Sequence, residues 1–282
     1  MIIRPKQETK NNTTFKIYQH CMMSDNAPHT IVDEQFVKKS FSKSKAWFVQ
    51  YTTEFDVPQP TTWWYCIKDE KYDISTFKAK ARYEVNKGRK NFSVSIISPL
   101  EYKNEIFDID IKKFADYPES YRPILASTAD EHIKKVVKDG DRWFGLFSKE
   151  DSSLVGYAII LEKEEFVNLS VVAIDPSTYK KNSSAGLVDG ILCHYQDSDK
   201  AVYICDGARN VRHQTNYQDF LISTFEFRKA YCRIRLKYKW WAGIAIFLLR
   251  PFKKLLLKSD KSFFYNLGCI LRLDEYARLS QK

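Results

Sequence analysis

The stretch FVNLSVVAIDPSTYKKNSSAGLVDGILCHY, residues 166–195, decides the fold. Its first nine residues are rich in Val, Leu and Ile and predict a buried strand over residues 166–174, which Asp175-Pro176 ends. From Ser184 to Tyr195 the apolar residues recur at helical spacing. A strand, a turn and a helix in this order are typical of an α/β domain.

The neighbouring elements extend this pattern in both directions. TADE, which begins at Thr128, is a capping box and predicts the start of a helix. A hairpin follows that helix, and a strand, a helix and a further strand follow the deciding stretch. We therefore predict an α/β fold with a mixed central sheet flanked by helices. The expected elements cover residues 128–137, 143–147, 154–161, 166–174, 184–195, 202–205, 215–225 and 231–238.

The first part of the chain has shorter and less regular elements. We expect a helix from Ser75 to Val85, with Ser75 as its N-cap and Gly88 beyond its end. Runs of aromatic and β-branched residues predict the strands. These strands cover residues 13–18, 46–52, 63–67 and 92–97.

The composition weighs against several common enzyme classes. Only 9 of the 282 residues are Gly. The chain has no phosphate loop, dinucleotide-binding, H-E-x-x-H or G-x-S-x-G motif, so kinase, dehydrogenase, zincin and α/β-hydrolase interpretations lose support. The five His do not stand at metal-ligand spacing, so we expect no metal. The six Cys form no C-x-x-C pair and residues 1–12 lack an apolar signal segment, which indicates a reducing cytoplasm.

The positive charge is concentrated at one end of the chain. The net charge is +10, and residues 226–282 contain 14 Lys and Arg but only 4 Asp and Glu. Such a block favours an anionic partner, either lipid headgroups, nucleic acid or a phosphorylated substrate. It surrounds WWAGIAIFLL, residues 240–249, which is shorter than the ~20 residues of a membrane-spanning helix. This segment either lies in the membrane interface or packs on the protein's own core with Pro251 as a bend.

The deciding stretch resembles the GNAT (Gcn5-related N-acetyltransferase) superfamily. In that family a loop of the type [QR]-x-x-G-x-[GA] precedes a helix, and its amides bind the cofactor pyrophosphate. Here KNSSAG, residues 181–186, stands in that place, with Lys181 for the Gln or Arg and Ser184 for the first Gly. The resemblance implies cofactor contacts from Lys181, Ser183, Ser184, Ala185 and Gly186.

A second part of the GNAT resemblance lies further along the chain. Asn216 opens YQDFLISTF, as an Asn opens the corresponding family helix, and the resemblance makes it a cofactor contact. Ser223 stands where many family members carry a Tyr general acid, so that role is not expected here. The apolar residues of both predicted helices are also simply core positions, and this interpretation is compatible with the fold.

The segment STFKAKARYEVNKGRKNFSVSII, residues 75–97, is similar to a segment of the Fem-type transferases. Those proteins resemble two GNAT-like modules in tandem and add amino acids to a lipid-linked peptidoglycan precursor. The residues that carry this likeness are Lys80, Arg82, Tyr83, Val85, Lys87 and Gly88. We therefore expect a trimmed GNAT-like module in residues 1–115, a GNAT-like acyltransferase domain in 116–238, and a basic, apolar helical segment in 239–282.

The resemblance also indicates where catalysis would occur. Backbone N–H groups at Val171, Val172 and Ala173 correspond to those that lie near the donor carbonyl in GNAT-like proteins. The loop CDGARNVRHQTN supplies two candidate bases, Asp206 and His213, because both side-chain types can accept a proton near neutrality. From the same loop, Arg209 and Arg212 are candidate contacts for a substrate phosphate or carboxylate.

Three functions follow as hypotheses. The first is an acyl- or aminoacyl-transferase that modifies an amino group of a cell-surface polysaccharide or peptidoglycan precursor and is peripheral on the cytoplasmic face of the membrane. The second is an N-acetyltransferase without membrane contact that uses acetyl-CoA. The third is a non-catalytic GNAT-like protein that binds RNA or another partner. Acyl-CoA is the expected cofactor, and aminoacyl-tRNA is the alternative donor.

Overall fold

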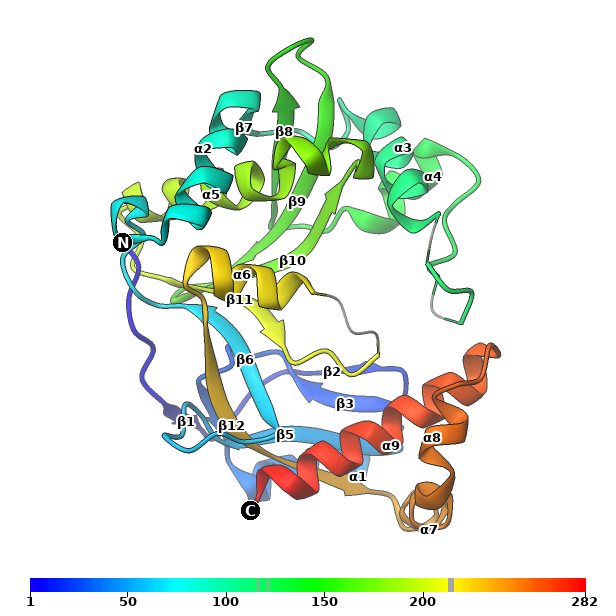
Figure 1. Ribbon diagram of the computed structural model, residues 1–282. Coiled ribbons are helices and arrows are strands. Elements are labelled where there is room, and N and C mark those ends of the chain that lie inside the picture. The colour runs from blue at the N-terminus through cyan, green and yellow to red at the C-terminus, as the bar shows by residue number, and fades with distance from the viewer. Residues whose placement is uncertain (116, 121, 213–215) are drawn as a thin grey trace.

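The computed structural model describes residues 1–282 except 116, 121 and 213–215. Figure 1 shows a mixed sheet with helices on both faces, as the sequence predicts. The strands are β1 (Glu8–Lys10), β2 (Phe15–Tyr18), β3 (Cys21–Ser24), β4 (Thr30–Val32), β5 (Phe48–Glu54), β6 (Trp63–Lys68), β7 (Phe92–Ile96), β8 (Asp141–Ser148), β9 (Leu154–Glu162), β10 (Phe166–Ile174), β11 (Tyr203–Ala208) and β12 (Arg228–Tyr238). The α-helices are α1 (Glu34–Lys43), α2 (Ala79–Asn91), α3 (Lys103–Phe114), α4 (Ala129–Val136), α5 (Ser183–Asp197), α6 (Tyr217–Phe225), α7 (Trp240–Leu249), α8 (Lys253–Leu256) and α9 (Ser262–Ser280).

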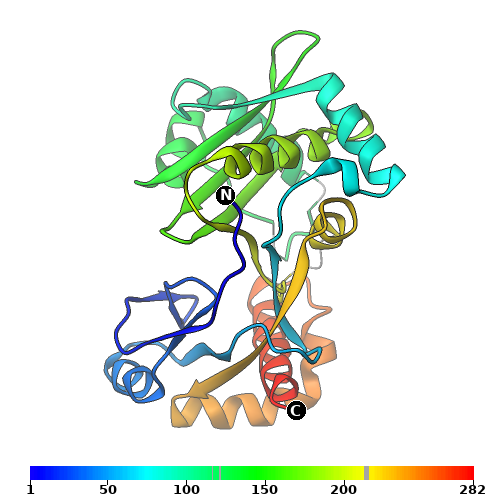
Figure 2. The same ribbon diagram turned by 90° about the vertical axis from the view of Figure 1, so that its left-hand side faces the viewer.

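Ten strands form the main sheet in the order β2-β3-β5-β12-β6-β11-β10-β9-β8-β7. The neighbouring pairs are antiparallel except for β3 with β5 and β10 with β11. β1 and β4 form a separate parallel pair. The central strands β6, β11 and β12 connect the part of the molecule that contains β7 to β10 with the part that contains residues 1–54 and α7 to α9 (Figure 2).

The parallel strands β10 and β11 stay paired over only a short distance. They pair from Phe166 and Tyr203 to Asn168 and Cys205, and then they diverge. On its other edge β10 remains paired with β9, with a bulge between Leu169 and Val171. The sheet is therefore open on one side of β10 where that strand approaches its C-terminal end.

The sheet mixes strands from distant parts of the sequence. β6 lies between β11 and β12, although it precedes them by more than a hundred residues. β7 and α3 also lie within residues 1–115, and they pack with β8 and β9. The three-part division of the chain remains a prediction.

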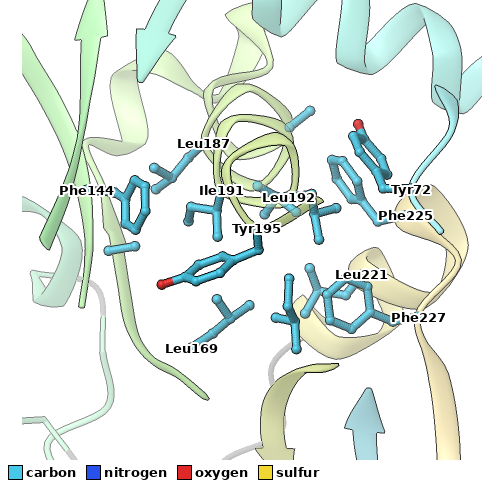
Figure 3. Packing of buried hydrophobic residues seen from close by; sticks show 14 of the residues in the cluster. Tyr72, Phe144, Leu169, Leu187, Ile191, Leu192, Tyr195, Leu221, Phe225 and Phe227 are labelled. Atoms are coloured by element: carbon cyan, nitrogen blue, oxygen red, sulfur yellow. The ribbon is translucent and has the colours of Figure 1, made fainter. Parts of the chain in front are cut away.

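The described residues form four buried apolar clusters, and two of them lie under the helices on the two faces of the sheet. On one face, α2, α5 and α6 cover a core to which Leu187, Ile191, Leu221 and Phe225 contribute (Figure 3). On the other face, α9 packs through Leu273 and Ala277. The helical spacing within the deciding stretch therefore reflects core packing as well as any function.

The predicted ends of one helix are wrong. Ser75 belongs to a short 3-10 turn, Ile74–Thr76, and α2 begins at Ala79. Gly88 lies inside α2, which continues to Asn91, because α2 crosses the start of α5 closely at this glycine. By contrast, the predicted cap at Thr128 is confirmed, since its side chain accepts a hydrogen bond from the Glu131 amide.

Candidate functional site

The candidate site begins where β10 and β11 diverge. Asp206 follows Cys205, the last residue of β11 that pairs with β10, and is half-buried. Burial raises the pKa of the Asp206 carboxyl group from 3.8 to about 7, and an interaction with the Gln218 side chain only partly opposes this shift. A carboxyl group with this pKa is partly ionised at neutral pH and can exchange a proton with a substrate.

Helix α6 forms the wall beside Asp206. The Tyr217 hydroxyl group is buried and has no hydrogen-bond partner in the described part of the chain. Burial raises the pKa of Tyr217, and the nearby Asp206 and Cys66 raise it further. Tyr217 therefore stays protonated and remains a hydrogen-bond donor. The sequence gives little sign of this role, because Tyr217 looks like an ordinary core aromatic residue.

The edge of β10 at the opening is partly occupied by a lysine. Lys113 of α3 donates a hydrogen bond of 2.7 Å from Nζ to the Val172 carbonyl oxygen. Burial lowers the pKa of Lys113. Of the predicted donor positions, Val171 and Val172 are half-buried and Ala173 is fully buried. The cation at this edge was not predicted from the sequence.

The predicted cofactor loop lies against α2. A Cβ atom on Gly88 would lie 2.6 Å from the Gly186 amide nitrogen, so the two backbones are in direct contact. Asn182 donates a side-chain hydrogen bond to the Glu84 carbonyl oxygen, and Lys181 accepts one from Asn91 at its own carbonyl oxygen. α2 therefore holds the turn before α5 from the side.

This arrangement does not fit the pyrophosphate of coenzyme A at residues 181–186. Ser183 is 0% exposed, and Ala185 and Gly186 are buried. The Lys181 ammonium group pairs with Glu150 at 2.7 Å. Asn182 and Ser184 are only half-exposed, so the amides of this turn do not form an open cradle for phosphate.

The loop after β11 is anchored by α9. The Arg209 guanidinium group donates to the Thr62 carbonyl oxygen at 2.9 Å and lies 4.1 Å from the centre of the Tyr276 ring. The Arg212 carbonyl oxygen accepts a hydrogen bond from the Tyr265 hydroxyl group. His213, the second predicted base, lies outside the described residues. Asn216 is exposed at the start of α6 and makes no side-chain cap hydrogen bond.

Two adjoining pockets lie on the face of the sheet that carries α9. A pocket of about 200 Å³ with a mixed polar and apolar lining, which we call the polar pocket to distinguish it from its neighbour, reaches Asn168 and Gly207 at the divergence of β10 and β11. A larger, mainly apolar pocket of about 550 Å³ lies between the β2–β3 turn and α9. Arg209 and Arg212 both line the larger pocket, so the structure brings these two predicted substrate contacts together.

The helices after β12 expose an unusual amount of apolar surface. We call this surface the α7–α9 apolar patch. Within α7 only Ala242 and Ile246 are buried, whereas Trp240 is 78% exposed. The exposed members of the patch are Trp240, Trp241, Ile244, Phe247, Leu248, Phe252, Leu255, Phe263 and Phe264.

Among the described residues, no group of three or more His, Cys, Asp or Glu side chains is arranged to hold a metal ion. Within the same residues, none of the helices has the length and apolar character needed to cross a bilayer.

Comparisons with known proteins place the fold. No family model matches the chain, and no curated protein matches it by sequence. The C-terminal domain of a protein named "Putative Lysylphosphatidylglycerol Synthetase" from Agrobacterium fabrum superposes with a TM-score of 0.52 and 9% identity, covering 83% of this chain and 82% of that one.

Two other solved structures are less similar. L-PGS from Bacillus licheniformis gives a TM-score of 0.49 at 12% identity, covering 80% of this chain and 79% of that one. A GCN5-related N-acetyltransferase from Sphaerobacter thermophilus gives 0.37 at 10% identity, covering 73% and 65%. At such identities the likeness concerns the fold alone. The chain has a GNAT-type fold, a mixed sheet that opens between two diverging parallel strands.

Proposed function

We propose that this protein transfers an acyl or aminoacyl group to an amine, with Asp206 as the general base. The observation that carries the proposal is the half-buried Asp206 carboxyl group, whose pKa of about 7 lies in the working range of a base at neutral pH. It stands at the opening between β10 and β11, where a substrate could reach it.

The reaction follows from these groups. The acceptor amine attacks the donor carbonyl carbon and forms the new C–N bond, while Asp206 takes the proton that the amine loses. The bond from the carbonyl carbon to the donor's leaving group then breaks. Tyr217, which is protonated in the resting site beside Asp206, is the candidate that gives a proton to the leaving group, and the proton on Asp206 then restores the Tyr217 hydroxyl group. Backbone amides at Val171–Ala173 are the proposed donors to the developing oxyanion.

The donor is proposed to be bound in a different way from coenzyme A in ordinary GNAT proteins. Because α2 packs against residues 181–186, this turn is not the proposed site of a coenzyme A pyrophosphate. The outward face of α2 carries Lys80, Tyr83 and Lys90, all exposed. Cations interleaved with an aromatic ring suit a polyanion with stacked bases, which favours aminoacyl-tRNA over acetyl-CoA as donor.

The acceptor is proposed to be an amine on a membrane-bound precursor of the cell surface. The α7–α9 apolar patch supports this part, because exposed Trp and Phe side chains on a helix flanked by lysines suit the membrane interface. The name of the similar Agrobacterium fabrum structure, a lysylphosphatidylglycerol synthetase, fits aminoacyl transfer to a lipid. We infer that the protein acts as a peripheral protein on the cytoplasmic face.

A transfer assay tests the proposal. The purified protein is incubated with labelled acetyl-CoA or with a labelled aminoacyl-tRNA pool, together with a total membrane lipid extract or a soluble amino sugar. We expect label to move from aminoacyl-tRNA into the lipid fraction. Asp206→Asn should lower the rate by ~10²–10⁴-fold, the usual contribution of a general base. Asp219→Asn, an exposed carboxylate on α6, is the matched control and should keep the rate.

Each outcome assigns the function differently. Transfer from acetyl-CoA to the amino sugar would replace the proposal with an N-acetyltransferase that needs no membrane. No transfer from either donor to any acceptor would support the non-catalytic, GNAT-like binding protein. A wild-type rate in Asp206→Asn would leave the reaction in place and remove Asp206 as its base.

A further inference from the structure

The apolar pocket of about 550 Å³ is a feature of the surface that the proposed chemistry does not use. Its walls are the β2–β3 turn, the start of β5, the loop after β11 and α9. Phe48, Leu267, Ile270 and Leu273 make much of its lining apolar. The volume lies within the ~300–1,000 Å³ typical of ligand pockets.

The basic side chains that line this pocket are those of Arg209, Arg212 and His20. None of the described lining residues is Asp or Glu. Arg209 is already engaged by Thr62 and the Tyr276 ring. The Nε atom of Arg212, in contrast, is buried and has no hydrogen-bond partner among the described residues. A buried guanidinium N–H without an acceptor is costly, and a bound anion would satisfy it.

The mouth of the pocket is continuous with the α7–α9 apolar patch at two places. The Trp47 ring, which lines the pocket, lies 5.3 Å from the ring of Trp241. Phe263 also lines the pocket, is 67% exposed, and lies 5.5 Å from Phe264. The lining of the pocket therefore meets the α7–α9 apolar patch at Trp47 and at Phe263.

The inner end of the apolar pocket adjoins the polar pocket, which reaches the divergence of β10 and β11 from the α9 face of the sheet. Met23 and Gln50 line both this pocket and the polar pocket beside it. The polar pocket reaches Gly207, which is the residue after Asp206. Its wall also carries a buried polar group without a partner among the described residues, the Asn26 amide nitrogen.

We propose that the apolar pocket takes one hydrocarbon chain of a membrane lipid, with the lipid's phosphate group at Arg212 and its headgroup directed past Met23 and Gln50 towards the polar pocket. The role of this lipid as a substrate rests on the proposed transfer function, whereas its binding does not. The occupant is a lipid drawn from the bilayer, because the pocket opens onto the α7–α9 apolar patch and its lining carries no carboxylate to repel a phosphate.

Calorimetry with single-chain lipids below their micelle concentration tests the binding. The probes are a lysophosphatidylglycerol and a monoacylglycerol of the same chain length, which lacks the phosphate. We expect the wild-type protein to bind one lysophosphatidylglycerol, and to bind it at least tenfold more tightly than the monoacylglycerol. Inorganic phosphate alone should not compete at millimolar concentration, which separates a lipid from a free phosphate.

Variants of the pocket complete the test. Leu267→Trp and Ile270→Trp fill the pocket from α9 and should each lower the affinity for both lipids at least tenfold. Leu100→Trp, on an exposed loop, is the matched control and should leave both affinities unchanged. Arg212→Gln should remove the preference for the phosphate-bearing lipid. A melting curve shows whether each variant folds. If one of the two pocket-filling variants does not fold, the other still tests the pocket.

The outcomes separate this inference from the proposed function. Wild-type lipid affinity in both folded filling variants, or an unchanged phosphate preference in Arg212→Gln, would overturn the pocket assignment. Asp206→Asn should bind lipid normally, because its side chain does not line the pocket. Lipid binding without any transfer would support the pocket assignment and contradict the transfer function. Transfer to a soluble amine without lipid binding would support the transfer function and contradict the pocket assignment.

Discussion

At the scale of single residues, burial shifts the pKa values of two ionisable side chains in opposite directions. Asp206 is half-buried at the sheet opening, and burial raises its pKa to about 7. Lys68 is 1% exposed, its Nζ has no hydrogen-bond partner among the described residues, and burial lowers its pKa. Each side chain costs stability in its charged form, but only Asp206 lies where the cost could serve a reaction.

Replacing Asp206 with Asn should stabilise the protein at alkaline pH. Between about pH 4 and 7 the folded state holds a proton that the unfolded state has lost, so stability falls as pH rises through that window. Above pH 7 the folded state carries the full cost of the buried carboxylate. We expect Asp206→Asn to raise the free energy of unfolding by ~1–3 kcal/mol at pH 8 and to change it little at pH 4. Urea unfolding at both pH values measures this; equal effects at the two values would contradict it.

Lys68 offers a second stability prediction. Among the described residues, its ammonium group lies 3.9 Å from the Glu226 carboxylate and 5.7 Å from the centre of the Phe77 ring. Its lowered folded pKa means that the cost is present in full below that pKa and disappears as pH rises towards 10.5. Lys68→Met should therefore raise the free energy of unfolding at pH 7 by ~1–3 kcal/mol. Denaturant unfolding of this variant beside the exposed control Lys80→Met tests it, and a destabilised Lys68→Met would show that the charge is compensated.

At the scale of elements, the crossing of α2 and α5 explains the segment that resembles Fem-type transferases. Gly88 allows the two backbones to touch at Gly186. Next to this crossing, Arg89 makes two hydrogen bonds of 2.8 Å to Asp189, which also accepts the Tyr72 hydroxyl hydrogen bond. These residues hold α2 over the start of α5, so part of the motif has a structural role.

A methyl group at Gly88 should separate the two helices. The added Cβ would lie 2.6 Å from a backbone nitrogen, which cannot move aside as a flexible side chain would. Gly88→Ala should lower the free energy of unfolding by ~1–3 kcal/mol despite the better helix propensity of Ala. The control is Gly243→Ala in α7, where the nearest atom is 3.6 Å away, and this variant should be neutral or stabilised by up to ~1 kcal/mol. Thermal melts compare them, and equal melting temperatures would refute close packing at Gly88.

At the scale of the whole molecule, much of the C-terminal positive charge is neutralised within the protein. Arg228 on β12 binds both Asp56 and Asp69, with donor–acceptor distances from 2.6 to 3.2 Å. Arg235 and Lys237, further along β12, pair with Glu34. The charge block in the sequence therefore overstates the basic surface available to a partner. Exposed Lys254, Lys258 and Lys261 lie on and after α8, beside the apolar patch.

The α7–α9 apolar patch should bring the protein to membranes. Trp240 and Phe247 are 78% and 66% exposed, so replacing them removes apolar contact with a bilayer and little of the core. The double variant Trp240→Ser with Phe247→Ser should bind anionic vesicles at least tenfold more weakly and keep the wild-type melting temperature. Leu100→Ser, an exposed apolar residue elsewhere, is the control. Vesicle co-sedimentation measures the binding, and unchanged binding of the double variant would exclude this patch as the membrane contact.

The same view of the molecule changes how the C-terminal segment should be tested. α9 packs on β12 and β6, and it anchors the loop at Arg212 through Tyr265. Removing residues 240–282 would therefore strip part of a core as well as the patch. Point substitutions on α7 separate the two roles, and truncation does not.

The sequence by itself determined the local elements and the type of fold. The strand over Phe166–Ile174, the helix that follows it and the cap at Thr128 depend on side-chain period and on bonds between near neighbours, and both are written in a single chain. The sequence also predicted Asp206 as a candidate base. It could not predict the raised pKa, because that depends on burial against α6.

The tertiary structure alone decided how distant segments meet. It inserted β6 between β11 and β12, laid α2 over the predicted cofactor turn and set Lys113 against β10. It also formed the apolar pocket from the β2–β3 turn and α9, segments more than two hundred residues apart. Pairing, close backbone contact and cavity shape depend on which surfaces exclude water together, and no periodicity along one segment carries that information.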